Sequence, residues 1–340
     1  MKIAQANFRA YRLPLESKLT TSTTERTIRH GWHIHLVDTE GNTGWGDVAT
    51  WPGFGSGHHV ALKVLRRVFA PEGGLNNAEV STIPRLIQTL NLSESPEVQH
   101  GVELALLDLL SQTDQTPLRQ RLNREAACRI PVCALVQTAQ EAAHACSTGT
   151  QTIKLKVGRE SVANDVQRIA GVRSAVGPRI KIRIDANGAW SLEQAKAAFK
   201  ALEAMKLEWI EQPLAANNIP GNQELRSTFS TPIAIDEGIT NSADLQLHIK
   251  EGALDVAVIK PMFVGGILAA RSLAEMARGA GLKVAITTAI ESNVGRMGAL
   301  QLAASLENDA IAFGLGTAVS NAHFADASIT NGYAYLPNTP

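Results

Sequence analysis

Cysteine is scarce in this chain, with three residues among 340: Cys128, Cys133 and Cys146. Their number is odd and their spacing is not that of metal-ligand pairs, so the sequence argues against a disulfide-stabilised fold and for a reducing compartment. Net charge is absent as well, because 32 Lys and Arg residues balance 32 Asp and Glu residues. No overall field therefore attracts nucleic acid or an anionic membrane, and any function that depends on charge must be local.

Long apolar runs are also missing. No segment reaches the roughly 18 apolar residues that span a bilayer, and residues 1–15 lack the continuous apolar stretch and cleavage site of a signal peptide. We therefore expect a cytoplasmic protein without nucleic-acid or membrane partners. The GxSxG and GxxxxGKS/T motifs do not occur, so the sequence gives no support to a nucleophilic hydrolase or a P-loop enzyme.

The composition is that of a globular protein, with 44% hydrophobic and 19% charged residues against typical values of about 45–50% and about 25%. The length suits one barrel of roughly 200–250 residues plus a smaller domain. Residues 1–48 are strand-like and predict an antiparallel meander. Apolar residues then recur at helical spacing over 58–70 and 95–112. We expect an α+β domain over residues 1–125.

From residue 131 the pattern changes to short apolar runs separated by amphipathic helical stretches. These runs are PVCALVQ, TIKLKV, IKIRIDA, LEWIEQ, IAIDE, VAVIK, KVAITTA and AIAFGLG. Eight such runs predict the parallel strands of an α/β barrel over residues 126–320, with an open doubly wound sheet as the structural alternative. Residues 321–340 contain no further strand and helix unit, and we expect them to pack on the N-terminal domain.

Polar residues fall at the ends of successive predicted strands. In order along the chain they are Lys154, Lys156, Asp185, Glu211, Asp236 and Lys260, and from Lys156 onward they are 24 to 29 residues apart. This interval is one strand and helix unit, so in a barrel these side chains converge on one mouth, where barrel enzymes carry their active sites.

The residue types in this set indicate a metal site beside acid-base groups. Asp185, Glu211 and Asp236 supply the hard oxygen ligands that Mg²⁺ prefers. Any one of them is as well explained as the cap of the following helix, but three at regular spacing are not. Lys154 and Lys156 lie on one face of their strand and suit proton transfer when partly desolvated. A solvated strand edge is their alternative. The nine histidines form no ligand set at the strand ends.

Two glycine-rich segments adjoin this set. Gly265 and Gly266 follow Lys260 and can bring backbone amides close to an anionic group at the start of a helix, although an ordinary turn explains them equally. The sequence WPGFGSG, residues 51–57, carries Phe54 and suits a lid that excludes water, with a plain surface loop as the alternative.

The motifs KLK, RIDANGAW, EWIEQPL, IAIDEGI, VIKPMFVGG and ESNVGR together resemble the enolase superfamily. The KLK motif with a lysine on the sixth strand is similar to the muconate-lactonizing subgroup, which includes cycloisomerases, dipeptide epimerases, N-succinylamino acid racemases and o-succinylbenzoate synthases. The resemblance implies a modified TIM barrel, (β/α)7β, with an N-terminal α+β capping domain.

The resemblance also implies roles for individual residues. The three carboxylates would bind Mg²⁺, or Mn²⁺ in its place, while Lys156 takes the α-proton of a small carboxylate substrate. Lys260 would face Lys156 across that substrate, Lys154 would support Lys156, and Glu237 would orient its neighbours. The residues expected at or beside the substrate are Phe54, Arg183, Asn187, Gly265 and Ser292.

Within the subgroup, two details favour a lyase of the o-succinylbenzoate synthase type in menaquinone or phylloquinone biosynthesis. They are the PGF sequence at 52–54 and the Glu291-Ser292 pair followed by Gly-Arg, where epimerases typically carry an aspartate pair. Arg26 and Arg29 could bind a succinyl carboxylate or another acid. Racemase, epimerase and cycloisomerase activities stay open. A barrel without enzymatic function would be expected to lose at least one of the six polar residues, and all six are present.

Overall fold

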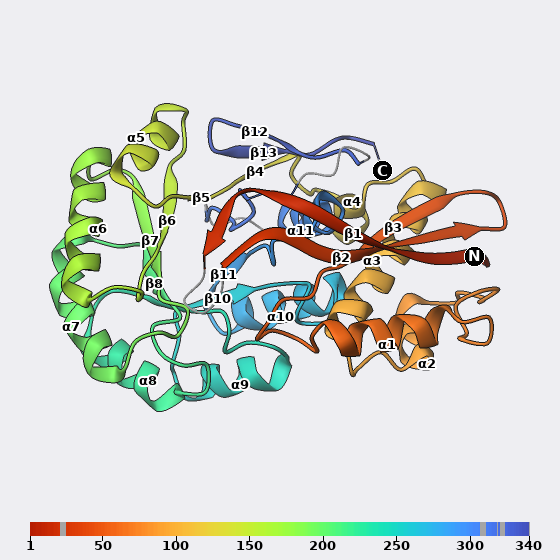
Figure 1. The fold of residues 1–340 in the computed structure, drawn as a ribbon, viewed down its shortest axis with the longest axis horizontal. Helices are drawn as coiled ribbons and strands as arrows, with labels where there is room; N and C mark the ends of the chain where they lie inside the picture. Colours follow the sequence, from red (N-terminus) through yellow and green to blue (C-terminus); the bar gives the residue numbers. More distant parts are fainter. Residues whose placement is uncertain (21–24, 307–310, 318, 320–323, 340) are drawn as a thin grey trace.

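The N-terminal segment folds as a three-stranded antiparallel sheet with helices packed against it (Figure 1). The computed structural model describes residues 1–20, 25–306, 311–317, 319 and 324–339. The strands lie in the order β1-β2-β3, with bounds β1 Ile3–Thr20, β2 Glu25–Asp38 and β3 Thr43–Val48. The predicted meander is confirmed. The helices are α1 His58–Phe69, α2 Ile83–Leu90, α3 Pro96–Thr113 and α4 Leu118–Leu122.

Helix α3 packs directly on strand β3, and glycine makes the close approach possible. A Cβ atom at Gly46 would lie 1.9 Å from the carbonyl oxygen of Gly101, and one at Gly44 would lie 2.2 Å from that of Ala105. Any side chain at these positions would force the helix away from the sheet. Most of α3 is consequently buried, including Glu97, His100 and Glu103.

The second part of the chain is a curled parallel sheet surrounded by helices. Its strands follow the order β11-β10-β9-β8-β7-β6-β5. Their bounds are β5 Ala134–Leu135, β6 Thr152–Lys156, β7 Lys181–Asp185, β8 Trp209–Glu211, β9 Ile233–Ile235, β10 Val256–Ile259 and β11 Lys283–Ile286. The helices are α5 Ala139–Ser147, α6 Val162–Val176, α7 Leu192–Leu202, η1 Glu203–Met205, α8 Ile219–Thr228, α9 Ser242–Lys250, α10 Ile267–Gly279 and α11 Asn293–Ser305.

The eighth predicted strand closes the ring through short bridges. Phe313 pairs in parallel with Val132, and Gly314 pairs with Thr287. The amide of Cys133 donates to the carbonyl of Phe313 at 2.8 Å. The expected barrel with an N-terminal α+β part is confirmed.

The first predicted barrel strand, 131–137, is divided between two sheets. Strand β4, Arg129–Pro131, pairs with the C-terminal strand β13, Tyr333–Tyr335, which in turn pairs with β12, Ser328–Thr330. Only β5 joins the barrel, because the backbone at Val132 turns from the hairpin to the bridge with Phe313.

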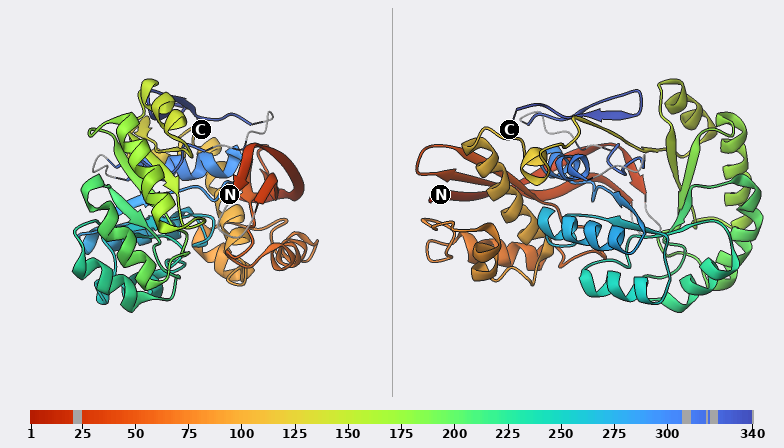
Figure 2. Two further views of the ribbon diagram at one scale, coloured as in Figure 1. Left: turned by 60° about the vertical axis from the view of Figure 1, so that its left-hand side comes forward. Right: turned by 180° about the vertical axis from the view of Figure 1, so that it is seen from behind.

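The C-terminal segment contacts both parts of the molecule. The guanidinium of Arg119 on α4 donates to the carbonyl of Pro337 at 2.7 Å and to Asn338 Oδ1 at 3.0 Å. The ring of Phe324 lies 4.9 Å from that of His33 and 4.8 Å from that of Trp45, both in the N-terminal sheet. Figure 2 shows the hairpin of β12 and β13 lying along the barrel, while the C-terminus approaches the N-terminal part.

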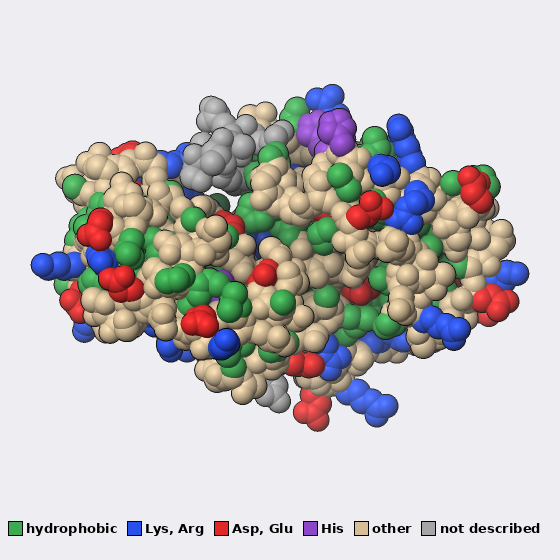
Figure 3. Space-filling view, turned by 90° about the horizontal axis from the view of Figure 1, so that it is seen from below, with side chains coloured by type: hydrophobic (Ala, Val, Ile, Leu, Met, Phe, Trp, Pro, Cys, Tyr) green, Lys and Arg blue, Asp and Glu red, His purple; other side chains and the backbone are tan. Residues whose placement is uncertain are grey.

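The surface carries charges of both signs. Figure 3 shows Lys and Arg side chains interspersed with Asp and Glu side chains on one face, in keeping with the balance of 32 basic and 32 acidic residues. Within the described residues, the helices are too short or too polar to cross a membrane.

Candidate active site

The parallel register places the predicted side chains beside one another. Lys156 pairs with Asp185 across β6 and β7, and Asp185 pairs with Glu211 across β7 and β8. Asp236 and Lys260 directly follow β9 and β10. Because these positions are at the carboxyl ends of neighbouring strands, all five converge on one mouth of the barrel.

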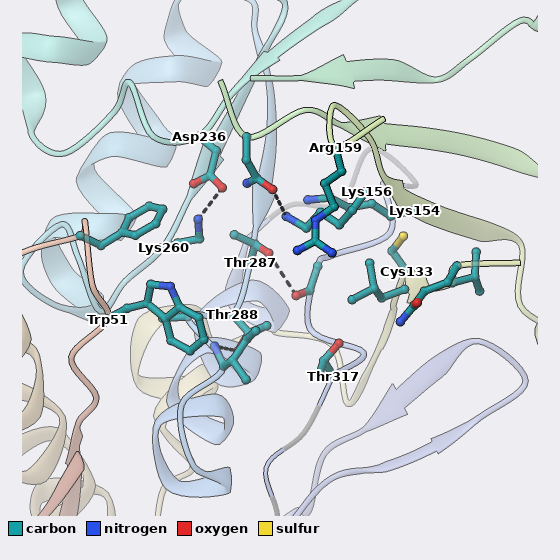
Figure 4. Close-up of a pocket in the computed structure, with 18 of the residues that line it drawn as sticks. Trp51, Cys133, Lys154, Lys156, Arg159, Asp236, Lys260, Thr287, Thr288 and Thr317 are labelled. Atoms are coloured by element: carbon teal, nitrogen blue, oxygen red, sulfur yellow. Dashed lines mark hydrogen bonds and ion pairs between the residues drawn. The ribbon is translucent and has the colours of Figure 1, made fainter. Parts of the chain in front are cut away.

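A cavity of about 410 Å³ opens at this mouth. Its lining includes Lys154, Lys156, Asp236 and Lys260, with Trp51 of the N-terminal part on another side (Figure 4). Phe54 of the N-terminal part lines it as well. The remaining lining residues come from β5 and its flanks, from helix α6 and from the loops that follow the strands: Cys133, Leu135, Val136, Gln137, Thr138, Arg159, Glu160, Asp165, Arg168, Asn187, Phe263, Thr287, Thr288, Ala289, Ile290, Gly314 and Thr317.

Each predicted carboxylate accepts a hydrogen bond from a lysine. Lys154 Nζ donates to Glu211 Oε1 at 2.6 Å and lies 2.7 Å from Asp185 Oδ2. Lys156 Nζ donates to the same Asp185 oxygen at 2.6 Å. Lys260 Nζ donates to Asp236 Oδ2. The buried charges of the two signs therefore compensate one another.

Burial and neighbouring charges shift the pKa values in this cluster in opposite directions. Desolvation favours neutral Lys154, but the charges of Asp185 and Glu211 outweigh it and raise the pKa of that lysine. Desolvation would raise the pKa of Asp185, yet the two lysines of the KLK motif lower it. Desolvation and the Asp185 charge raise the pKa of Glu211 to about 7. Additional positive charge beside Glu211 would therefore favour its ionised form.

The helices that follow these strands are capped by other residues. Ser191 accepts from the amide of Gln194 at the start of α7, and Asn218 and Asn241 cap α8 and α9 in the same way. Helix capping therefore does not explain the three carboxylates.

The donor set fits a divalent cation such as Mg²⁺. Asp185, Glu211 and Asp236 are three buried carboxylates on adjacent strands, and oxygen ligands of this kind are those that Mg²⁺ prefers. Beside them, Glu237 Oε2 is buried without a hydrogen-bond partner among the described residues, so acceptors outnumber donors there. Among the described side chains, no three potential ligands are arranged to hold a metal ion. Lysine ammonium groups contact the carboxylates in this structure.

Asn187 and Glu237 position Lys156. The side-chain oxygen of Asn187 accepts from Lys156 Nζ at 2.8 Å, and its amide nitrogen donates to Glu237 Oε1 at 2.8 Å. Asn187 has a φ of 46°, a left-handed conformation that Asn tolerates well. Glu237 thus has the orienting geometry expected of it, and Asn187, expected at or beside the substrate, lines the cavity.

The 51–57 loop covers the cavity. The Phe54 ring stacks on Phe263 with ring centroids 5.1 Å apart and lies 4.6 Å from Lys260 Nζ. The Glu97 carboxylate anchors the far end of the loop, because it accepts from the backbone amide of Ser56 at 3.0 Å and from its hydroxyl at 2.9 Å.

Arg183 does not reach the substrate cavity, contrary to its expected place beside the substrate. It points into the barrel interior two residues before Asp185, where Nε donates to Glu208 Oε2 at 2.6 Å and Nη1 donates to the carbonyl of Ala312 at 2.6 Å. Its guanidinium carbon lies 3.6 Å from the centre of the Trp209 ring. Side chains on one strand face share a direction but differ in depth, so Arg183 closes the lower barrel instead.

Gly265 and Ser292 are also outside the cavity. Residues of the N-terminal part form hydrogen bonds with both of them. The carbonyl of Gly265 accepts from Gln99 Nε2 at 2.8 Å. Ser292 donates through its amide and its hydroxyl to Asp47 Oδ2, at 2.8 and 2.7 Å. The anion expected near Gly265 and Gly266 does exist, but it is the carboxylate of Glu103 on α3.

Arg29 is likewise unavailable to a substrate carboxylate, since its guanidinium donates to backbone carbonyls. The side chain of Arg26 lies outside the described residues.

Several cavity residues were not expected from the sequence. Arg159 lies in the loop that follows β6, and Figure 4 shows its side chain extending toward Lys156. Thr287 and Thr288 directly follow β11. The available signal was position: Arg159 follows the predicted run TIKLKV, and Thr287 and Thr288 lie near the end of the run KVAITTA. Such residues are common at the ends of strands and do not by themselves indicate a site.

Comparison with known proteins agrees with this geometry. The family model described as "Enolase C-terminal domain-like" matches residues 137–340. The hydrophobic dipeptide epimerase of Enterococcus faecalis is 30% identical, over 94% of this chain and 93% of that protein. The N-succinyl-L-Arg/Lys racemase of Bacillus cereus is 29% identical, over 90% and 85%. The o-succinylbenzoate synthase of Thermobifida fusca is 40% identical, over 55% and 59%.

Solved structures show the same fold. The Enterococcus faecalis dipeptide epimerase, complexed with Mg and the dipeptide L-Leu-L-Tyr, superposes with a TM-score of 0.90 at 25% identity, over 100% of this chain and 98% of that one. The L-Ala-D/L-Glu epimerase of Bacillus subtilis gives a TM-score of 0.91 at 24% identity, with the same coverage. With lysines and carboxylates at the strand ends and a family match over the barrel, this chain belongs to the enolase superfamily.

Proposed function

We propose that this protein is an o-succinylbenzoate synthase, a lyase that dehydrates 2-succinyl-6-hydroxy-2,4-cyclohexadiene-1-carboxylate to 2-succinylbenzoate in menaquinone or phylloquinone biosynthesis. The reaction breaks one C–H bond and one C–O bond, releases water and leaves an aromatic ring. Support from relatives is divided, since the synthase match has the higher identity while the racemase and epimerase matches cover more of the chain.

The observation that carries the proposal is the polarity of the cavity. The charged side of its lining is opposed by a wall that contains no carboxylate, formed by Thr287, Thr288, Ala289, Ile290 and Thr317. The segment 311–317, which closes the barrel through Phe313 and Gly314, contains no Asp or Glu. A dipeptide would bring an α-ammonium group that needs an anionic partner, whereas a cyclohexadiene ring needs apolar surface. The wall therefore favours the ring.

The chain's own residues supply the proton chemistry. Asp185, Glu211 and Asp236 would hold Mg²⁺, which when bound stabilises negative charge on the substrate carboxylate. Lys156 faces the cavity and would remove the α-proton. The same ammonium group would then return that proton to the departing hydroxyl on the same face.

Lys260 would act as a fixed cation on the opposite side. Burial alone would lower its pKa, but the charges of Asp236 and Glu237 outweigh burial and raise it, so this lysine stays protonated at neutral pH. The succinyl carboxylate would meet Arg159, whose guanidinium extends toward the cavity (Figure 4).

N-succinylamino acid racemase is the second candidate. Racemisation needs an acid-base group on each face of the substrate, and Lys156 on β6 and Lys260 after β10 lie on different sides of the cavity. The 29% identity to the racemase of Bacillus cereus extends over 90% of this chain.

One pair of assays separates the two functions. Protein purified with Mg²⁺ should convert the cyclohexadiene carboxylate to the aromatic product, followed by ultraviolet absorbance, with the Lys156→Ala variant as the control for background loss of water. N-succinylamino acids should be tested in parallel for α-proton exchange in D₂O. Exchange and racemisation without any dehydration would contradict the synthase and leave the racemase.

A further inference from the structure

Ile290 adopts a backbone conformation that its side chain disfavours. Its φ is 58°, in the left-handed region, and the residue lines the cavity. A β-branched residue rarely occupies this region, because its Cβ crowds the following carbonyl. Strain of this kind persists only where surrounding contacts impose it, and such residues cluster at functional sites.

Arg29 contacts the backbone at this position. A guanidinium has five N–H donors, and Arg29 uses one of them, Nε, to donate to the carbonyl of Ile290 at 2.7 Å. Its terminal nitrogens donate to four further backbone carbonyls: Ala49 at 2.8 Å, Ala289 at 3.3 Å, His30 at 3.3 Å and Thr50. Every donor is therefore used, and the carbonyls replace water around a charge that is only 3% exposed.

Four of these five acceptors belong to two segments that are far apart in sequence. Ala49 and Thr50 precede Trp51 in the cap, whereas Ala289 and Ile290 follow barrel strand β11. Trp51 also stacks against the guanidinium, with Arg29 Cζ 5.1 Å from its ring centre. Arg29 therefore fastens the cap and barrel contributions to the cavity wall to one another.

The part of the cavity wall next to Arg29 is apolar. Ala49, Trp51, Phe263 and Ala289 belong to one buried cluster, and Phe54 packs against it. Within the turn itself, the amide of Ile290 donates to Thr288 Oγ1 at 2.8 Å. The turn is thus held by one hydrogen bond of its own. The hydrogen bonds that connect it to the N-terminal part come from Arg29.

We propose that Arg29 is a positioning residue that holds Ile290 in its left-handed conformation and so fixes the part of the cavity wall formed by Trp51 and Ile290. This inference deepens the proposed function, on which it rests for the identity of the substrate: the wall determines which carbon skeletons fit beside Lys156 and Lys260. Arg29 acts through the two segments and touches no substrate.

The test is a double-mutant cycle between Arg29→Gln and Ile290→Gly, with two readouts. The first is amide hydrogen exchange in peptides covering 46–56 and 286–294, which needs no substrate. The second is kcat/KM with whichever carboxylate the wild type converts. Arg119→Gln is the matched control, because Arg119 is equally buried and also donates to a backbone carbonyl, but at the C-terminal segment.

Arg29→Gln should speed exchange in both segments and lower kcat/KM by about 10²-fold, the cost of misplacing a site by roughly 1 Å. Glycine adopts a positive φ without strain, so the same change should cost at least threefold less in the Ile290→Gly background. Arg119→Gln should lower the melting temperature and leave both readouts at wild-type values. If Arg29→Gln does not fold, Arg29→Lys should show the same pattern, because an ammonium cannot replace the planar fork.

Unchanged hydrogen exchange in the two segments would overturn the inference. So would a double variant in which the losses of kcat/KM from the two single changes simply multiply. Because exchange requires no substrate, the exchange result is independent of the proposed function. A protein that fails to dehydrate the cyclohexadiene but shows the exchange pattern would retain the role of Arg29 and lose only the synthase.

Discussion

Lys156 and Lys260 differ in their surroundings. The Lys156 side chain is 31% exposed to the cavity and hydrogen-bonds Asn187 as well as Asp185. The Lys260 side chain is 14% exposed, donates to Asp236 and lies under the Phe54 ring. The more accessible lysine suits proton transfer, whereas the enclosed one suits fixed positive charge.

We predict that Lys156→Ala abolishes both dehydration and exchange of the substrate α-proton with D₂O. Loss of a general base typically costs roughly 10² to 10⁴-fold. Lys260→Ala should slow turnover while Mg²⁺ affinity, measured by calorimetry, is retained. Lys196→Ala on the outer helix α7 is the control and should behave as wild type. Near-normal dehydration by Lys156→Ala would refute the assignment.

At the scale of elements, the cap domain supplies the anions at two barrel helices. Glu103 of α3 accepts from the amide of Leu268 at 2.9 Å at the start of α10, and Asp47 of β3 accepts from the amide of Ser292 at 2.8 Å at the start of α11. Neither helix has a side-chain cap of its own. Helix N-termini favour negative charge, so these contacts hold the cap against the barrel mouth.

The Glu103 contact predicts a pH dependence of stability. Burial raises the pKa of Glu103 to about 7, against bonds from two backbone amides that lower it. Between about pH 4.5 and 7 the folded protein therefore keeps a proton that the unfolded chain releases, and the free energy of unfolding falls as pH rises through this window. Glu103→Gln should remove on the order of 3 kcal/mol of that fall.

Urea denaturation at several pH values measures this effect. The variant and the wild type should differ most in pH dependence between about pH 5 and 7, where Glu103 is protonated in the folded state and ionised in the unfolded chain, and the free energy of unfolding of the variant should gain on that of the wild type up to about pH 7.5. Parallel curves for the two proteins across this range would contradict the prediction.

The 51–57 loop gives a second prediction at this scale. Phe54→Ala removes the ring that covers Lys260 and stacks on Phe263, so water should enter and kcat/KM should fall by about tenfold or more, with little change in melting temperature. Phe69→Ala is the matched control, because Phe69 packs its edge on Phe8 away from the cavity. It should lower stability and leave turnover intact. Unchanged kcat and KM in Phe54→Ala would exclude the loop as a lid.

For the whole molecule, the carboxylate cluster predicts a link between metal and stability. A cation bound only by the folded state raises the free energy of unfolding by about 2.7 kcal/mol at a hundred times its Kd. Mg²⁺ should therefore raise the melting temperature and EDTA should abolish turnover. Asp236→Asn should reduce both effects, whereas Asp255→Asn, at a surface ion pair with Arg226, should leave the Mg²⁺ increment unchanged. Full turnover with verified absence of metal would refute the site.

The sequence by itself determined the barrel and its polar mouth. Lys156, Asp185 and Glu211 recur at the interval of one strand and helix unit, and parallel strands in register necessarily bring such residues together. Local spacing is sufficient for this inference because the last residue of each parallel strand lies at the barrel mouth, whatever contacts that residue makes with distant segments.

Only the tertiary structure decided what surrounds that mouth. Ser292, Gly265 and Arg29 have the residue types of substrate contacts, yet each is taken up by the junction between cap and barrel. Their partners lie up to 261 residues away in the chain, as for Arg29 and Ile290. The depth of Arg183 was hidden for a related reason, because strand periodicity gives the direction of a side chain and not its height in the barrel. Contacts between distant segments depend on how the two domains dock, and no local pattern encodes that arrangement.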